Sequence, residues 1–317
     1  DLLGSVVHGD MKGVQITGLA NLAGGTMRGV QLAGISNISG NNTVGLSAAG
    51  LVNITGDRTQ GVIISGLTSI GGDNTSGLMI SGFMNVTGNM ASGLHFSGAA
   101  NITGQSFGGL MASGLLNVVG EHMNGLQIAG IANITASKLN GVQIALCNYV
   151  TQARGLQIGL VNYYKEDMKG FQLGLVNANP DTRVQMMVYG GNATPVNIGV
   201  RFKNQLFYTI LGVGSMYQGL NDKFSASASY RAGLSFPLYK GLSISGDLGY
   251  QHIEAFDNKD EVIPKRLYAL QARANLEYQF TRKFGIYATG GYGLTRFYNK
   301  SSNYDKGAII EAGIVLF

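Results

Sequence analysis

GVQITGLANLAGGTMR, from Gly13 to Arg28, is followed directly by GVQLAGISNISGNNTV at 29–44 and by GLSAAGLVNITGDRTQ at 45–60. The opening glycine of this sixteen-residue unit recurs without a slip as far as Gly141, and looser copies begin at Gly155 and Gly170. A fixed period this short is typical of a solenoid, in which each copy forms one coil stacked on its neighbours.

Aligned copies turn sequence positions into columns that run along the solenoid. The positions one and three residues after the opening glycine are mostly apolar, as in Val14 and Ile16, and so is the position nine residues after it, as in Leu22. Apolar residues two apart share one face of a β-strand, whereas a helix needs spacings of three and four. We therefore expect a β-coil of two short strands, with these apolar columns facing inward and the column of Gln15 facing outward.

An almost unbroken file of asparagine stands eight residues after the opening glycine. Side chains stacked at the ~4.8 Å spacing of β-strands can hydrogen-bond to one another and to turn backbone. The sequence predicts one ladder at a corner of the coil, interrupted by Ser69 and made by Asn21, Asn37, Asn53, Asn85, Asn101, Asn117 and Asn133.

The composition excludes several classes of protein. Charged residues make up only 12% of the 317 residues, about half the share of an ordinary soluble domain. The net charge is +5, but the basic residues are scattered and form no stripe, so we expect no nucleic-acid partner. A single cysteine excludes an intrachain disulfide and a zinc cage.

From Arg183 onward the glycine rhythm gives way to long segments of alternating polar and apolar residues. Strands of ten to fifteen residues, with aromatics at the ends of the apolar face, are typical of outer-membrane barrels. The connections alternate between tight turns and longer polar loops, such as 257–265 and 299–306, as such barrels require. The eight predicted strands are 183–191, 196–203, 206–217, 224–236, 242–256, 266–280, 284–299 and 306–317.

These patterns resemble two known kinds of protein. Residues 183–317 resemble the small eight-stranded outer-membrane barrels, and GLQIGLVN at 155–162 and GFQLGLVN at 170–177 resemble the surface-repeat proteins predicted in Gram-negative bacteria. We therefore expect an all-β chain: a β-solenoid at 1–182 followed by an eight-stranded antiparallel transmembrane β-barrel at 183–317. Loop alternation favours the periplasmic side of the outer membrane for the solenoid, whereas the surface-repeat resemblance implies the cell surface.

Strand parity directs six charged residues into the barrel lumen. An eight-stranded barrel is just wide enough inside to be filled by side chains, so we expect a closed salt-bridge network. The alternative is a polar conduit or a carboxylate-assisted catalytic site. The six are Arg201, Arg231, Asp247, Arg273, Glu277 and Glu311.

One stretch of the Gln15 column loses its polarity. Here Ile63, Met79, His95 and Met111 replace glutamine, beside a column of small residues. A flat and partly apolar β face of this kind predicts a docking surface for a partner. The alternative is that the face is buried against another sheet of the same coil.

The repeats contain no carboxylate cluster of the kind that glycan-cleaving solenoids use, and no histidine has the spacing of a metal site or a triad. We therefore predict no catalytic, metal or cofactor-binding residues. The predicted function is a non-enzymatic outer-membrane protein in contact with membrane lipid, whose anchored solenoid is a scaffold for another envelope protein or complex. The alternative is a surface adhesin or glycan-binding protein, against which the few aromatic residues of the repeats count.

Overall fold

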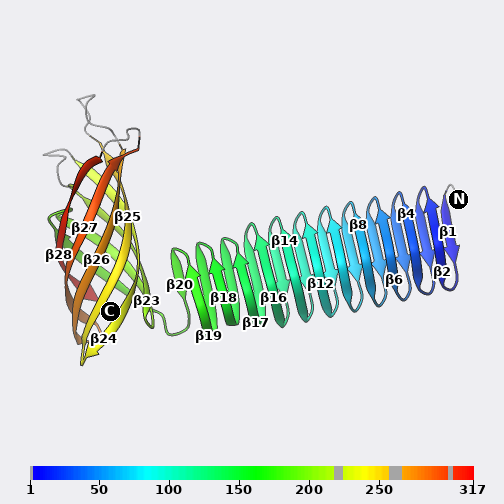
Figure 1. The fold of residues 1–317 in the computed structure, drawn as a ribbon, viewed down its shortest axis with the longest axis horizontal. Helices are drawn as coiled ribbons and strands as arrows, with labels where there is room; N and C mark the ends of the chain where they lie inside the picture. The colour runs from blue at the N-terminus through cyan, green and yellow to red at the C-terminus, as the bar shows by residue number, and fades with distance from the viewer. Residues whose placement is uncertain (1–2, 218–223, 257–265, 299–302) are drawn as a thin grey trace. The chain divides into compact units, whose positions relative to one another are not determined.

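The computed structural model describes residues 3–217, 224–256, 266–298 and 303–317, which form an all-β fold (Figure 1). The chain divides into two compact units between Gly174 and Leu175, so that residues 175–182 are grouped with the barrel. The first unit is built from a parallel sheet wound as a solenoid, and the second contains a closed antiparallel barrel. Across the described ranges, no helix has the length and apolar character needed to cross a membrane.

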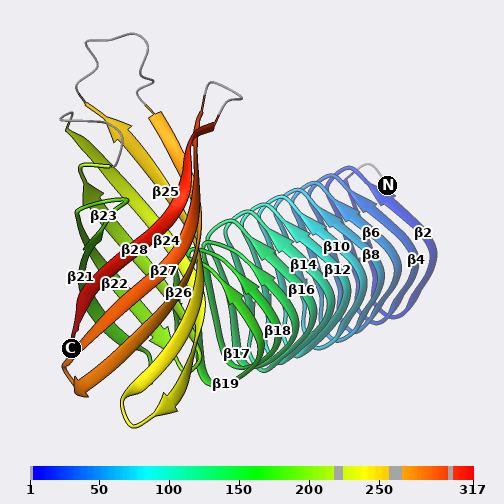
Figure 2. The same cartoon turned by 60° about the vertical axis from the view of Figure 1, so that its left-hand side comes forward.

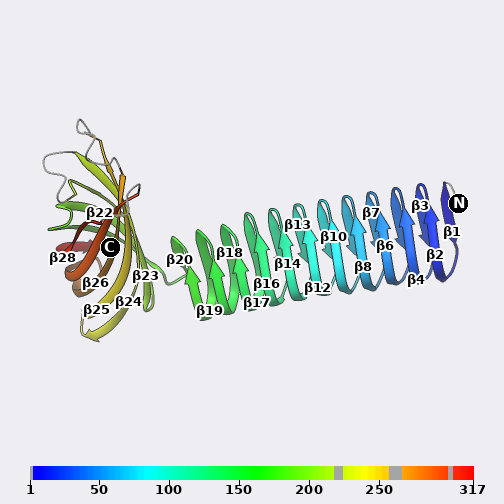
Figure 3. The same cartoon turned by 45° about the horizontal axis from the view of Figure 1, so that its top comes forward.

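Each coil of the solenoid contains a longer and a shorter strand on opposite sides (Figures 2 and 3), as the sequence predicted. The longer strands are β2 (Met11–Thr17), β4 (Met27–Ala33), β6 (Thr43–Ala49), β8 (Thr59–Ser65), β10 (Thr75–Ser81), β12 (Met90–Ser97), β14 (Ser106–Ser113) and β16 (His122–Ala129). The shorter strands are β1 (Gly4–Val7), β3 (Ala20–Ala23), β5 (Ser36–Ser39), β7 (Val52–Thr55), β9 (Thr68–Gly71), β11 (Met84–Thr87), β13 (Ala100–Thr103), β15 (Leu116–Val119) and β20 (Val176–Ala178). In the looser copies, β17 (Ala132–Ile144), β18 (Cys147–Ile158) and β19 (Val161–Leu173) run through both positions.

The register explains why the opening glycine never varies. Each strand pairs in parallel with its equivalent one coil later, so that Gly61 lies opposite Gly45 and Gly77. Gly61 has a φ of 129°, a backbone conformation that side chains rarely adopt. A Cβ built there would lie 2.1 Å from the carbonyl oxygen of Gly45, so any larger residue would push the coils apart.

The solenoid faces the opposite way from the expectation. Val14 and Ile16 are 67% and 58% exposed, whereas the side chains between and beside them, Gln15 and Thr17, are buried. The apolar columns therefore cover the outside. The amide and hydroxyl columns lie inside, together with buried apolar side chains such as Met27, Phe107 and Met123. The prediction was wrong because alternation separates two faces of a strand but does not say which one is inside.

Eight antiparallel strands close the barrel, because the last one pairs with the first. Turns of two residues join the second strand to the third, the fourth to the fifth and the sixth to the seventh. The predicted loop 257–265 lies outside the described residues, as do 299–302 of the predicted loop 299–306, and the last strand begins earlier than expected. The strands are β21 (Arg183–Gly191), β22 (Val196–Asn204), β23 (Phe207–Ser215), β24 (Ser225–Tyr239), β25 (Leu242–Ala255), β26 (Arg266–Thr281), β27 (Phe284–Phe297) and β28 (Asn303–Leu316).

The outer surface of the barrel is apolar, and its ends are aromatic. Leu248, Leu270 and Ile310 are among the large apolar side chains exposed on it. Exposed aromatic rings lie near the two-residue turns at Tyr239, Phe280 and Phe284. At the opposite end, the rings of Tyr250, Tyr268 and Tyr298 pack together, and Phe224 packs on Phe256.

Candidate functional site

An asparagine ladder runs inside the solenoid, beside the turns that follow the longer strands. The amide of Asn37 donates to the Oδ1 of Asn53 at 3.0 Å and to the carbonyl oxygen of Ala48 at 2.8 Å. Each amide thus joins its coil to the next and satisfies a carbonyl beside the turn. The same amide-to-amide bonds join Asn21 to Asn37, and then Asn85, Asn101, Asn117, Asn133, Asn148 and Asn162 in series. The last two belong to the looser copies and were not predicted.

A relay of hydroxyl groups carries the ladder past Ser69, whose side chain is too short to span two coils. The amide of Asn53 donates to the Ser65 hydroxyl at 2.8 Å, and the hydroxyls of Ser65 and Ser69 lie 2.7 Å apart. The Ser69 and Ser81 hydroxyls follow at 2.9 Å, and Ser81 also donates to the Oδ1 of Asn85 at 2.6 Å. Ser65 and Ser81 come from the small-residue column, so two neighbouring columns cooperate at the interruption.

Glutamines form a second inner ladder where the Gln15 column retains its polarity. Gln31 donates to Gln15 at 2.8 Å, and Gln143 donates to Gln127 at the same distance. Gln157 and Gln172 continue the series through the looser copies. Buried amides pair well in such stacks because each carries both donors and an acceptor.

The predicted partner face is part of this inner column and not a surface. The side chains of Ile63, Met79, His95 and Met111 are all buried inside the coil. The alternative weighed for this face, burial within the coil itself, is therefore the one that the structure shows. These four residues offer nothing to a partner.

His95 is neutral in its buried position. The ring packs edge-on against Phe107, with ring centroids 5.0 Å apart, and its Nε2 has no hydrogen-bond partner. Burial disfavours the charged imidazolium and lowers the pKa of His95 from 6.5 to about 4. The ring thus fills space in the column without contributing a charge.

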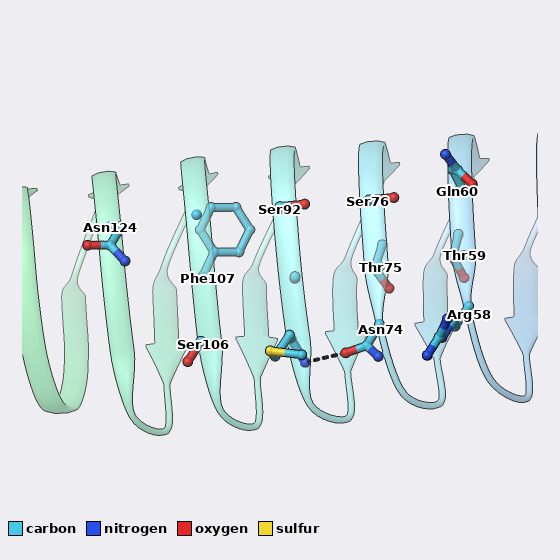
Figure 4. Close-up of a pocket in the computed structure, with 13 residues that line it drawn as sticks. Arg58, Thr59, Gln60, Asn74, Thr75, Ser76, Ser92, Ser106, Phe107 and Asn124 are labelled. Carbon is cyan, nitrogen blue, oxygen red and sulfur yellow. Dashed lines mark hydrogen bonds between the residues drawn. The ribbon is translucent and has the colours of Figure 1, made fainter.

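A groove of about 570 Å³ runs along the solenoid surface across the beginnings of β8 to β16 (Figure 4). It follows the column formed by the residue immediately before each opening glycine. In these coils that residue has a short side chain or none, as at Ser76, Ser92 and Gly108. The same column holds longer side chains, such as Arg28 and Arg154, in other coils. Of the described residues that line the groove, Arg58 alone is charged. The lining consists of Arg58, Thr59, Gln60, Asn74, Thr75, Ser76, Met90, Ala91, Ser92, Ser106, Phe107, Gly108 and Asn124.

The barrel lumen holds all six predicted charged residues, each at most 7% exposed. Arg201 binds Glu277 through two bonds of 2.6 and 2.9 Å and also donates to the Oε1 of Gln185. Arg273 binds Glu311 through two bonds of 3.2 and 3.1 Å. Bidentate pairs of this kind hold a guanidinium and a carboxylate in one plane.

The third pair lies at the centre of the network. Arg231 donates to both carboxylate oxygens of Asp247 at 2.8 Å, and its Nη1 lies 3.7 Å from Glu311. Tyr208 and Asn275 complete the shell of Asp247 with bonds of 2.7 and 2.8 Å to its Oδ2. The carboxylates are therefore engaged by fixed donors, which fits the predicted closed salt-bridge network better than the alternatives of a conduit or a catalytic site.

Nowhere in the described part of the chain do three His, Cys, Asp or Glu side chains gather closely enough to hold a metal ion.

Comparison with known proteins finds similarity in the barrel. No protein-family model matches the chain, and no curated protein matches its sequence. The N-terminal β-barrel domain of Pseudomonas aeruginosa OprF aligns over 42% of this chain and 93% of its own, with 15% identity and a TM-score of 0.31. Neisserial surface protein A aligns over 42% of this chain and 94% of its own, with 10% identity and a TM-score of 0.30.

Proposed function

We propose that this chain is a non-enzymatic outer-membrane protein whose barrel anchors a solenoid scaffold, and that another envelope protein docks in the groove across β8 to β16. The observation that carries the docking role is the groove itself, a mostly uncharged depression created where one column becomes short over several successive coils.

The barrel has the properties of a membrane anchor. Strands β24 to β28 are 14 to 16 residues long, more than the roughly 9–11 residues that a tilted strand needs to cross a bilayer. Its outer face is apolar and carries aromatic rings at both ends, where outer-membrane barrels have their interfacial girdles. The ion pairs that fill the lumen support an anchoring role over conduction or catalysis, because they leave no carboxylate free of a guanidinium partner.

The groove suits an extended protein segment. It crosses five coils, which at ~4.8 Å per coil gives a length of roughly 20 Å, enough for about six residues of a strand. Hydroxyl and amide groups such as those of Ser76, Asn74 and Asn124 line it with both donors and acceptors, and Met90 adds an adaptable apolar contact. A polar lining with the single charge of Arg58 favours recognition of a peptide backbone over recognition of a highly charged ligand.

Loop lengths favour the periplasmic side of the membrane for the solenoid. The barrel begins at Arg183 and ends after Leu316, and both positions lie at the end with the two-residue turns. Outer-membrane barrels turn tightly on the periplasmic side, so the chain that precedes Arg183 would emerge there. Cleavage of the solenoid by a protease added to intact cells would instead favour the surface location and the adhesin alternative.

A glycan-binding role receives less support from the same groove. Sugar rings are commonly held by stacking on aromatic faces, and the aromatic residue of the groove, Phe107, is 1% exposed and packed on His95.

The test is to fill the groove and follow the bound protein. Ser92→Arg places a long side chain at the centre of the groove, and Asn140→Arg is the matched control in the same column, where the next coil already has Arg154. We expect a protein to co-purify with the wild-type chain and the control from gently solubilised membranes, and to be lost from Ser92→Arg. Retention of that protein by Ser92→Arg would show that the groove is not its docking site.

A further inference from the structure

Charged side chains are confined to one edge of the solenoid. Every Asp, Glu, Lys and Arg described between residues 3 and 174 lies within the five residues that precede an opening glycine, as Arg28, Asp57 and Lys138 do. We call this side of the coil the charged edge. The ten residues that start at each opening glycine, such as 13–22 and 45–54, contain no Asp, Glu, Lys or Arg in any coil.

The remaining outer surface is a continuous apolar belt. It covers the outside of the longer strands, where Val14 and Ile16 are exposed, and the outside of the shorter strands, where Leu22 and Ile70 are exposed. Soluble proteins rarely expose an apolar patch of more than a few hundred Å². Here the belt follows both sides of the sheet from β2 to β19, so water is an unfavourable environment for it.

The turns opposite the charged edge are apolar at their tips, and we call this side the apolar edge. Turns in water usually carry Gly, Asn, Asp or Ser, whereas these tips are exposed large apolar residues. They include Leu19, Ile35, Leu51, Leu67, Phe83, Leu115, Ile131, Leu146 and Leu160.

Backbone amides at the apolar edge are satisfied without water. The amide of Leu67 donates to the carbonyl oxygen of Leu51 at 2.9 Å, and the amide of Thr68 donates to the same oxygen at 3.0 Å. The next coil repeats these bonds, with Phe83 and Met84 donating to Leu67. Turn amides that are bonded from coil to coil leave these donors satisfied in contact with hydrocarbon.

We propose that the solenoid lies within one leaflet of the membrane, with its apolar edge among the lipid acyl chains and its charged edge at the headgroups. The dimensions fit a single leaflet. The charge-free part of β2, from Gly13 to Thr17, rises roughly 17 Å at ~3.3 Å per residue. Half of a ~30 Å hydrocarbon core is about 15 Å, so the belt is as tall as one leaflet is thick.

The covalent connection supports the same environment, and this step rests on the proposed membrane-spanning barrel. Nine residues, 174–182, lie between β19 and β21. Fully extended, they allow a separation of at most about 35 Å, which is less than the ~40–45 Å thickness of a bilayer with its headgroups. A barrel in the membrane therefore keeps the end of the solenoid within about 35 Å of the barrel, which allows the solenoid to enter the adjacent leaflet.

Lipid explains the shape of the belt better than a protein partner does. A protein that covered the belt would have to enclose both sides and the apolar edge of every coil. Acyl chains surround such a shape without specific complementarity, as they do around the barrel. The groove at the charged edge stays available to the proposed docking partner, because it lies on the headgroup side of the belt.

The native Cys147 gives a direct test. It is the one cysteine of the chain, and it is exposed beside Leu146 at the apolar edge. We would attach the environment-sensitive fluorophore NBD to Cys147 in the purified full chain, reconstituted in phospholipid vesicles with no other protein. The matched control carries NBD at Lys138→Cys in the Cys147→Ser background, at an exposed position on the charged edge.

We expect blue-shifted emission from the Cys147 probe, strong quenching by lipids with a nitroxide on the acyl chain, and little quenching by aqueous iodide. The Lys138→Cys probe should show the reverse order of quenching. Water-like emission at Cys147, with iodide quenching equal to that of the control, would overturn the proposal and would indicate that a protein covers the belt in the cell. Because the vesicles contain no partner, this outcome is independent of docking in the groove. Protection of the barrel strands from added protease in the same vesicles reports separately on the anchor.

Discussion

The hydroxyl relay at Ser69 makes a sharp prediction about two serines in one column. Ser81→Ala removes the hydroxyl that links Ser69 to Asn85. Ser97→Ala makes the same chemical change one coil later, at the residue that pairs with Ser81 in the parallel register. The Ser97 hydroxyl is buried but has no hydrogen-bond partner, because the asparagine ladder is intact beside it.

The two variants should differ in stability by several kcal/mol. In Ser81→Ala, the Oδ1 of Asn85 loses its 2.6 Å donor inside the coil, and a buried acceptor without a donor costs about 1–3 kcal/mol. The lost bond to Ser69 adds about 1 kcal/mol, so we expect a destabilisation of about 2–4 kcal/mol. Ser97→Ala removes an unsatisfied buried hydroxyl, so we expect no loss or a slight gain.

Hydrogen exchange of the full chain, read by mass spectrometry, measures the effect where it arises. Stability in stacked repeats is close to a sum of local terms, so the change should be confined to coils next to the relay. A loss of about 2–4 kcal/mol corresponds to roughly 30- to 700-fold faster exchange of the amides of β9 and β11 in Ser81→Ala. The barrel strands should exchange at the wild-type rate in both variants.

Equal exchange rates in the two variants would refute this reasoning. That result would mean that the amide and hydroxyl groups inside the coil are satisfied in some other way, such as by water, and that the ladder does not carry the stability assigned to it.

Three further predictions follow from buried groups. His95→Gln should remove an acid sensitivity of the solenoid, because the unfolded state binds a proton below pH ~6.5 and the folded state only below about 4. The free energy of unfolding of the wild-type solenoid should therefore fall by about 3 kcal/mol as the pH is lowered between these values, and that of the variant should fall less, as measured by pH-dependent hydrogen exchange. Gly77→Ala should destabilise the coils by more than about 2 kcal/mol in urea titrations, because φ is 117° and the new Cβ would lie 2.1 Å from a carbonyl oxygen. In the control Gly108→Ala, the new Cβ meets nothing within 4 Å, so the stability should be nearly unchanged. Glu277→Ala should destabilise the barrel by about 3–5 kcal/mol because it leaves Arg201 buried without its carboxylate. When samples are heated before electrophoresis, the folded band should be lost at a lower temperature than in the wild type, and the double variant Arg201→Leu, Glu277→Leu should restore much of the difference. An unchanged temperature for Glu277→Ala would contradict the pairing.

The repeat length of the solenoid and nearly all of the barrel strands could be predicted from the sequence. The unvarying glycine sets the coil length because positive φ and close carbonyl contact exclude every other residue there. The asparagine file implied its own ladder, because a stacked amide can bond only to the next one. In the barrel, the first predicted strand coincides with β21, and strand parity identified the lumen-facing charges because the interior of so narrow a barrel must be filled.

The solenoid differs from the prediction in which side of its strands faces inward, because apolar residues are ordinarily buried and here they cover the outside. The sequence predicts that Ile63 and Met79 are exposed because they replace polar residues, and polar residues are expected to face water. A usable signal was present in the positions of the charges. A coil with water on all sides would carry charged residues on both outer faces, yet Arg28 and every other described Asp, Glu, Lys or Arg of the solenoid occur only in the residues before an opening glycine. The groove depends on side-chain length in one column, and the relay depends on bonds between columns, so neither could be derived from periodicity alone.

Both units bury many polar side chains and have apolar exteriors, but they satisfy the buried polar groups by different chemistry, and the difference follows from symmetry. In the barrel, neighbouring strands are unrelated in sequence, so Asp247 can lie opposite Arg273 and buried charges can alternate in sign. In the solenoid, every inner position faces its own copy one coil away. Like charges at ~4.8 Å repel by about 3 kcal/mol at an effective dielectric constant of about 20, and this term would recur at every coil. An amide avoids the repulsion because it donates at one end and accepts at the other, so that Asn101 bonds to Asn85 on one side and to Asn117 on the other. The polar inner columns of a short exact repeat are therefore restricted to neutral side chains that can both donate and accept, and the charges of such a chain are left to the outer edge.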